Sequence, residues 1–118
     1  MSSHPLPFAI SVTPVGDGTV RVQVQGELDM STSPQLHQVL GHEIAAGKRV
    51  VVDLSEIAFI DSTGLNTLIA ALRASDYHSG ELMVSPSMPS QVKRVLEITG
   101  LDQVLPIAAE AADTSAAR

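Results

Sequence analysis

An almost unbroken apolar run, Val50-Val51-Val52-Asp53-Leu54, constrains the fold of this chain more than any other feature. Parallel strands that are covered on both faces have such runs, whereas half-exposed strands alternate apolar and polar residues. The run therefore predicts a central parallel strand. Because parallel neighbours are joined by crossovers that usually contain a helix, the chain should alternate strands and helices.

The residues before this strand predict a hairpin and a helix. Apolar residues alternate with smaller or polar ones over residues 8–12 and 20–24, and Gly16-Asp17-Gly18 between them is typical of a turn. The Ser33-Pro34 pair predicts a helix start, with Ser33 as the cap and Pro34 at the first helical position. The apolar face of this helix comprises Leu36, Val39, Leu40 and Ile44.

Two more helices and two more strands are predicted after the central strand. Asp61-Ser62-Thr63-Gly64 begins a helix, residues 82–84 form a short strand, and a third helix after Pro89 ends at Gly100. A weak last strand is expected at 104–107. The inward faces are Leu65, Leu68, Ile69 and Leu72 in the second helix and Val92, Val95, Leu96 and Thr99 in the third. The predicted order is β-β-α-β-α-β-α-β, which is an α/β fold with right-handed crossovers.

The composition limits the functional classes. The 118 residues suffice for one domain over 1–118, with a core of about 8–107 and a flexible tail of about 110–118. A net charge of -6 makes direct contact with nucleic acid unfavourable. The absence of cysteine excludes disulfides and thiolate metal sites. No signal peptide and no membrane-spanning stretch are visible, so we expect a cytoplasmic protein.

The most distinctive local feature is Asp61-Ser62-Thr63-Gly64-Leu65, which joins a buried strand to an amphipathic helix. Backbone N–H groups are unpaired at a helix start, and the dipole there is positive, so a phosphate on Ser62 would be tolerated. The alternative is that Asp61 or Ser62 only caps the helix. From spacing alone the capping role is the more common one, and both interpretations stay open.

Enzymatic alternatives lack their usual residues. A hydrolase elbow needs Gly-x-Ser-x-Gly, but Ile60 stands where the first glycine would be. His37 and His42 are about 140° apart around their helix, so they make a poor metal-chelating pair. Asp53 is expected to accept hydrogen bonds from a nearby turn, and no glycine-rich phosphate loop is present. We therefore expect no catalytic residue, no metal and no cofactor.

Three segments together resemble a known family. Gly26-Glu27-Leu28-Asp29, the run at 50–54, and Phe59-Ile60-Asp61-Ser62-Thr63-Gly64-Leu65 have the order and spacing of the STAS family, in particular of bacterial anti-sigma factor antagonists. The resemblance covers about residues 8–107. It implies a small, mostly parallel sheet with an antiparallel first strand at one edge and helices largely on one face.

The resemblance also implies a function. Such antagonists bind an anti-sigma factor that is also a serine kinase, and thereby release the sigma factor for transcription. The kinase phosphorylates the serine after the aspartate, here Ser62, which ends the binding, and a serine phosphatase reverses it. Asp29, Asp61, Thr63 and Gly64 are the expected partner contacts. The alternatives are an unphosphorylated scaffold subunit of a stress-signalling or lipid-transport complex and, from another class, a small serine hydrolase or a phosphocarrier.

Overall fold

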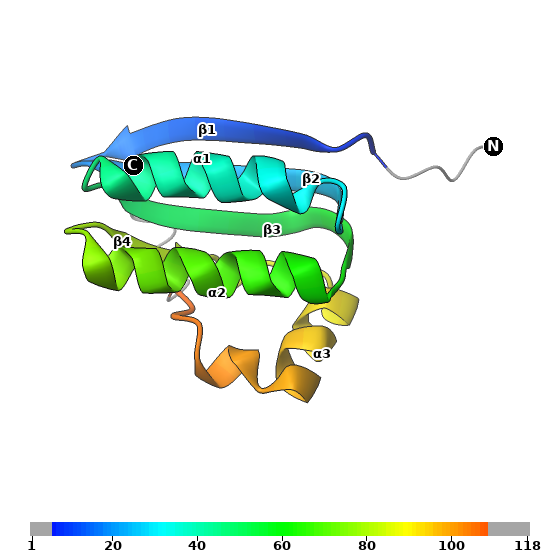
Figure 1. Ribbon diagram of the computed structural model, residues 1–118. Coiled ribbons are helices and arrows are strands. Elements are labelled where there is room, and N and C mark those ends of the chain that lie inside the picture. The colour runs from blue at the N-terminus through cyan, green and yellow to red at the C-terminus, as the bar shows by residue number, and fades with distance from the viewer. Residues whose placement is uncertain (1–5, 109–118) are drawn as a thin grey trace.

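The computed structural model describes residues 6–108 (Figure 1). Its strands are β1 (Ala9–Gly16), β2 (Thr19–Leu28), β3 (Arg49–Ile60) and β4 (Glu81–Val84). Its helices are α1 (Ser33–Ala45), α2 (Ser62–Tyr77) and α3 (Ser90–Thr99), and a 3-10 turn follows at Leu101–Gln103.

The four strands of the described chain form one sheet in the order β1-β2-β3-β4. β1 is antiparallel to β2, and β3 runs parallel to both β2 and β4. Helices α1 and α2 lie side by side in front of the sheet, and α3 lies below α2 in the view of Figure 1. The predicted fold class, with an antiparallel edge strand and a parallel centre, is therefore confirmed.

The run at 50–54 is the centre of the sheet, as predicted. Val50, Val52 and Leu54 have no exposed surface, and they join the core beneath the helices. Val51 and Asp53 are also buried. β3 is longer than the apolar run because it continues through Ser55 and Glu56, with irregular pairing to β2.

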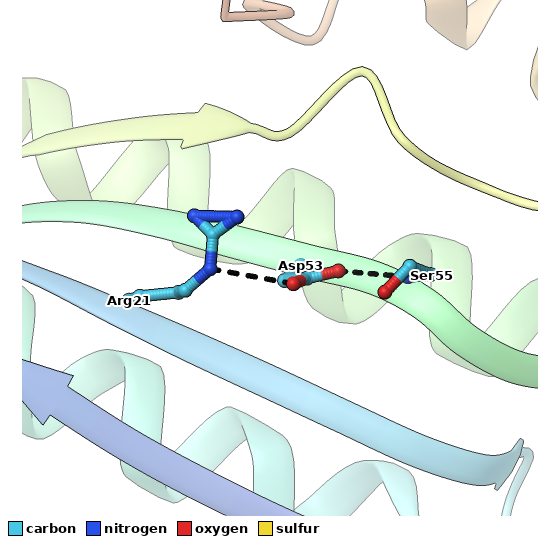
Figure 2. Close-up of polar contacts among 3 residues, drawn as sticks. All are labelled: Arg21, Asp53 and Ser55. Carbon is cyan, nitrogen blue, oxygen red and sulfur yellow. Dashed lines mark hydrogen bonds and ion pairs between the residues drawn. The ribbon is translucent and has the colours of Figure 1, made fainter. Parts of the chain in front are cut away.

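Asp53 keeps its buried carboxylate in a small polar network, which Figure 2 shows. Arg21 Nε on β2 lies 3.3 Å from Asp53 Oδ2, and the Ser55 backbone N–H donates to Asp53 Oδ1 at 2.9 Å. The sequence predicts a donor from a nearby turn, but the donor is the Ser55 N–H, which lies in the irregular part of β3. One of the two contacts comes from β2 and the other from β3 itself, so the network links two neighbouring strands.

The predicted last strand is wrong. Within residues 6–108, one isolated bridge, between Val84 and Ile107, joins this segment to β4. Val84 N–H donates to Pro106 O, and Ala108 N–H donates to Val84 O, both at 2.8 Å. Pro106 has no N–H to extend a ladder, and Leu105 N–H is held by Leu101 O in the preceding turn. The predicted tail at 110–118 lies outside the described residues.

Some local predictions also need correction. Thr32 is the N-cap of α1 and Ser33 is its first residue, so Pro34 is at the second helical position and not at the predicted first. Thr99 is exposed, and its hydroxyl donates to Val95 O. On α2, Leu65 and Leu68 are buried as predicted, whereas Ile69 and Leu72 are half-buried.

Candidate functional site

The candidate site lies where β2 and β3 end. Leu28 and Ile60 are paired residues of these parallel strands, so the residues that follow them leave the sheet at the same edge. Those residues are Asp29 and Asp61, and the Asp61 N–H donates to Leu28 O at 3.1 Å. Open α/β sheets bind ligands and partners at such carboxyl ends. The fold thus brings together two carboxylates that are far apart in the sequence.

Asp61 is the cap of α2. Its Oδ1 accepts from Thr63 N at 2.9 Å, from Gly64 N at 3.1 Å and from the Thr63 hydroxyl at 2.6 Å. The Leu65 N–H donates to Asp61 O at 3.0 Å. Most N–H groups at this helix start are therefore already paired, which is the capping role that the sequence left open.

Asp29 orders the loop before α1 in a similar way. Its Oδ1 accepts from the Ser31 N–H at 2.9 Å and from the Ser31 hydroxyl at 2.7 Å. The Thr32 hydroxyl donates to Glu27 O at 2.8 Å, which ties the loop to β2. The side chain of Asp29 thus holds a local turn next to the start of α2.

Both carboxylates have lowered pKa values. The pKa of Asp61 lies below its ordinary 3.8, chiefly because the Thr63 hydroxyl donates to it and also because the Gly64 N–H does. The negative charge of Asp29 opposes this effect, so the two groups are near enough to repel each other. The pKa of Asp29 is also lowered, with the hydroxyl of Ser31 as the largest cause. Hydrogen bonds to the charged form favour that form, so both groups are anionic at neutral pH.

Ser62 and Thr63 are neighbours with different surroundings. Ser62 is the first residue of α2 and is exposed, and within the described residues its hydroxyl makes no hydrogen bond. Thr63 is half-buried, and its hydroxyl is committed to Asp61. Among the described residues, the Ser62 hydroxyl therefore has no hydrogen-bond partner, whereas the Thr63 hydroxyl donates to Asp61.

Gly64 permits the close approach of α2 to the sheet. It is buried, and a Cβ atom there would lie 2.9 Å from Ile60 Cγ1, 2.9 Å from Leu28 Cγ and 3.0 Å from Leu28 O. The sequence suggested Gly64 as a partner contact. The structure gives it a position below the surface, from which it sets the height of Ser62 above the strand ends.

Within residues 6–108, no side chain forms a hydrogen bond with the Ser62 hydroxyl. Across residues 6–108, no three acidic or histidine side chains are grouped to hold a metal ion. No helix of that part of the chain is long and apolar enough to cross a membrane.

A surface hollow of about 410 Å³ adjoins the site, and the sequence did not indicate it. It lies between the first halves of α1 and α2 and is lined by Met30, Ser33, Pro34, His37, Thr63, Asn66 and Thr67. One sequence signal was present: Met30 is a large apolar residue in an otherwise polar loop, and it is 74% exposed.

Comparisons with known proteins agree on one family. The protein-family model described as "Mlab, STAS domain" matches residues 13–106 of this chain. The anti-sigma-B factor antagonist of Staphylococcus aureus is 34% identical over 94 residues, which cover 79% of this chain and 86% of the relative. The corresponding antagonist of Listeria monocytogenes is 29% identical, covering 75% and 77%. The crystal structure of an anti-sigma factor antagonist from Mycobacterium paratuberculosis superposes with a TM-score of 0.75 at 30% identity, covering 95% of this chain and 96% of the other.

Proposed function

The chain belongs to the STAS domain family, and from this premise we propose that it is an anti-sigma factor antagonist switched by phosphorylation of Ser62. Unphosphorylated, it binds an anti-sigma factor that is also a serine kinase, and the sigma factor is released. Phosphorylation of Ser62 ends the binding, and a serine phosphatase restores it. The protein acts by binding and is the kinase's substrate rather than an enzyme.

One observation carries the proposal: Ser62 is exposed and its hydroxyl has no hydrogen bond within the described residues, while the adjacent Thr63 hydroxyl is held by Asp61. A phosphoryl acceptor must leave its own contacts to enter a kinase active site. Ser62 has none to give up within the described residues, whereas Thr63 would have to break a 2.6 Å bond to a carboxylate. This difference favours Ser62 over Thr63 as the acceptor.

The surroundings of Ser62 support a switch that acts by charge. A phosphate brings about -1.5 to -2 charges at neutral pH. Because Asp61 already occupies the N–H groups of Thr63 and Gly64, few backbone donors are left to neutralise it. The phosphate would therefore stand as a strongly hydrated anion beside Asp61 and Asp29. A partner surface that fits the unmodified site would have to strip that hydration, which is costly.

Phosphopeptide mass spectrometry tests the proposal. The purified chain is incubated with Mg-ATP and, one at a time, with the kinase-type anti-sigma factors encoded in its own genome. Trypsin releases residues 50–73 as one peptide, which contains Ser55, Ser62, Thr63 and Thr67, so fragmentation must locate the phosphate. We expect phosphate on Ser62 and none in Ser62→Ala.

Two results would contradict the proposal. Phosphate on Thr63 with none on Ser62 would move the acceptor by one residue. If no kinase modifies the chain, the unphosphorylated scaffold subunit becomes the better account of the same fold.

A further inference from the structure

The strand that leads to Ser62 is longer than the strand it pairs with. β2 has 10 residues and β3 has 12, yet the two strands are paired from their first residues to their last. The additional residues enter β3 at two places. Leu54 and Ser55 stand where β2 has only Val24, and Ala58 lies between two residues of β3 whose partners are consecutive in β2.

These two insertions determine where β3 ends. Strands advance about 3.3 Å per residue, so without the insertions Asp61 and Ser62 would lie about 6–7 Å further along the sheet, past the end of β2. One insertion alone would also turn the following side chains to the opposite face. With both insertions, Asp61 is level with the end of β2, and its N–H donates to Leu28 O at 3.1 Å. The inward-facing residues then lie three apart in the sequence: Leu54, Ile57, Ile60.

Asp53 holds the first insertion. Its Oδ1 accepts from the Ser55 N–H at 2.9 Å, and its Oδ2 lies 3.3 Å from Arg21 Nε on β2 (Figure 2). The Asp53 side chain is only 8% exposed, and a buried carboxylate is costly unless its oxygens keep their partners. The carboxylate therefore ties the inserted backbone of β3 to the neighbouring strand.

Gln91 of α3 holds the second insertion. Its Nε2 donates to Ala58 O at 2.8 Å, across 33 residues of sequence. Ala58 has no partner on β2, so the register of that strand does not fix the inserted residue. The third helix thus contacts the backbone of β3 four residues before Ser62.

We propose that Asp53 and Gln91 are positioning residues for the phosphorylation of Ser62, because each holds one insertion of β3 and together they fix the strand end that presents Ser62. The inference rests on the proposed function, since it takes Ser62 as the phosphoryl acceptor. Inserted strand residues beside functional sites commonly redirect a side chain in this way. Both residues act on Ser62 through the backbone of β3.

Four variants test the inference. Gln91→Glu keeps the length of the side chain but cannot donate to Ala58 O, and a carboxylate in the first turn of α3 favours the helix. Arg94→Ala is the matched control: it also lowers the net charge by one, and Arg94 is exposed on α3 without a hydrogen bond or ion pair in the part of the chain that the structure describes. Asp53→Ala removes both contacts of the first insertion, whereas Asp53→Asn keeps an oxygen for the Ser55 N–H.

Amide hydrogen exchange measured by NMR reports on the strand end without the kinase. In Gln91→Glu we expect the Asp61 N–H to exchange about threefold faster or more, as the loss of one hydrogen bond allows. The Ser85 N–H donates to Val52 O at 2.8 Å, before the insertions, and should keep the exchange rate of the parent. In Asp53→Ala the acceleration should be larger at Asp61 than at Ser85, and Asp53→Asn should lie nearer the parent. A general loss of stability would accelerate both amides alike.

Phosphorylation kinetics test the consequence for Ser62. With a kinase that modifies the parent chain, kcat for Gln91→Glu should fall about threefold or more with little change in KM, because a displaced acceptor slows the transfer more than the docking. Arg94→Ala should be phosphorylated like the parent.

Different results overturn different claims. If the Asp61 N–H exchanges at the parent rate in Gln91→Glu and Asp53→Ala, or if Ser85 accelerates equally in both, these residues do not position the strand end, while the proposed function stands. If kcat for Gln91→Glu equals that of the parent, or falls equally in Arg94→Ala, the contact with Ala58 does not serve phosphorylation. If no kinase modifies the parent chain, the proposed function fails and the positioning role for Ser62 fails with it.

Discussion

Replacing Gly64 with alanine should destabilise the protein, although the same change usually stabilises a helix. An added methyl group would lie 2.9 Å from Ile60 Cγ1 and 3.0 Å from Leu28 O. The Leu28 carbonyl cannot easily retreat, because it accepts the Asp61 N–H. Helix α2 must therefore lift from the strand ends, and Ser62 lifts with it.

Gly41 in α1 provides the matched control. A methyl group there would meet nothing within 4 Å. Glycine to alanine in a helix gains about 0.5–1 kcal/mol from backbone propensity, a gain that is similar at both positions. Overpacking a well-packed core costs about 1–3 kcal/mol. Because the propensity gain cancels in the comparison, Gly64→Ala should be less stable than Gly41→Ala by about 1–3 kcal/mol.

Urea unfolding followed by far-ultraviolet circular dichroism measures this difference. The far-ultraviolet signal is preferable, because the chain has no tryptophan and one exposed tyrosine. Gly41→Ala should be at least as stable as the parent, with an unchanged dependence on urea concentration. If Gly64→Ala is as stable as Gly41→Ala, the close approach of α2 to Leu28 and Ile60 is not the reason for glycine at this position.

Three further predictions follow from the core and the site. Leu68→Ala should lower the free energy of unfolding by about 2–5 kcal/mol, because Leu68 is fully buried. Leu72→Ala should lower it by less, because Leu72 is only half-buried. Equal losses in urea unfolding would contradict this orientation of α2. Thr63→Val should raise the pKa of Asp61 toward 3.8 in an NMR titration, since it removes the main hydrogen bond to the carboxylate. The stability that this hydrogen bond contributes is present above the unfolded-state pKa of Asp61 and is lost as pH falls through its lowered folded-state pKa. The free energies of unfolding of parent and variant should therefore differ at neutral pH and converge in strong acid. A difference that does not change with pH would be evidence against the bond. The purified chain should hydrolyse no generic ester, and turnover that disappears in Ser62→Ala would make it an enzyme.

Periodicity was enough to predict most of the fold. The run at 50–54 identified the central strand because burial on both faces leaves no polar alternation. The last strand failed because a short apolar segment does not reveal whether its backbone donors are free. Here Pro106 has none, and Leu105 is engaged in a turn. Ser33 was assigned as a cap from its residue type, whereas the chain places Thr32 there.

The site was predictable in its residues but not in its geometry. Spacing identified Asp61 and Ser62 as candidates, and the resemblance suggested the role that we propose for Ser62. Spacing could not show that the Thr63 hydroxyl is held by Asp61, because that bond depends on the rotamers of the first helical turn. The surface hollow beside Met30 could not be predicted, because it forms only when α1 and α2 pack together.

The central claim is that one phosphate on Ser62 controls partner binding, and calorimetry of both forms tests it most directly. The unmodified chain and the fully phosphorylated chain are titrated separately into the same kinase with bound nucleotide. A loss of about 2.7 kcal/mol would weaken binding about 100-fold, which suffices for a switch. We expect phosphorylation to weaken binding about 100-fold or more. Ser62→Ala that has been treated with kinase and Mg-ATP should bind as tightly as the unmodified chain. Equal affinity of the two forms would contradict the account.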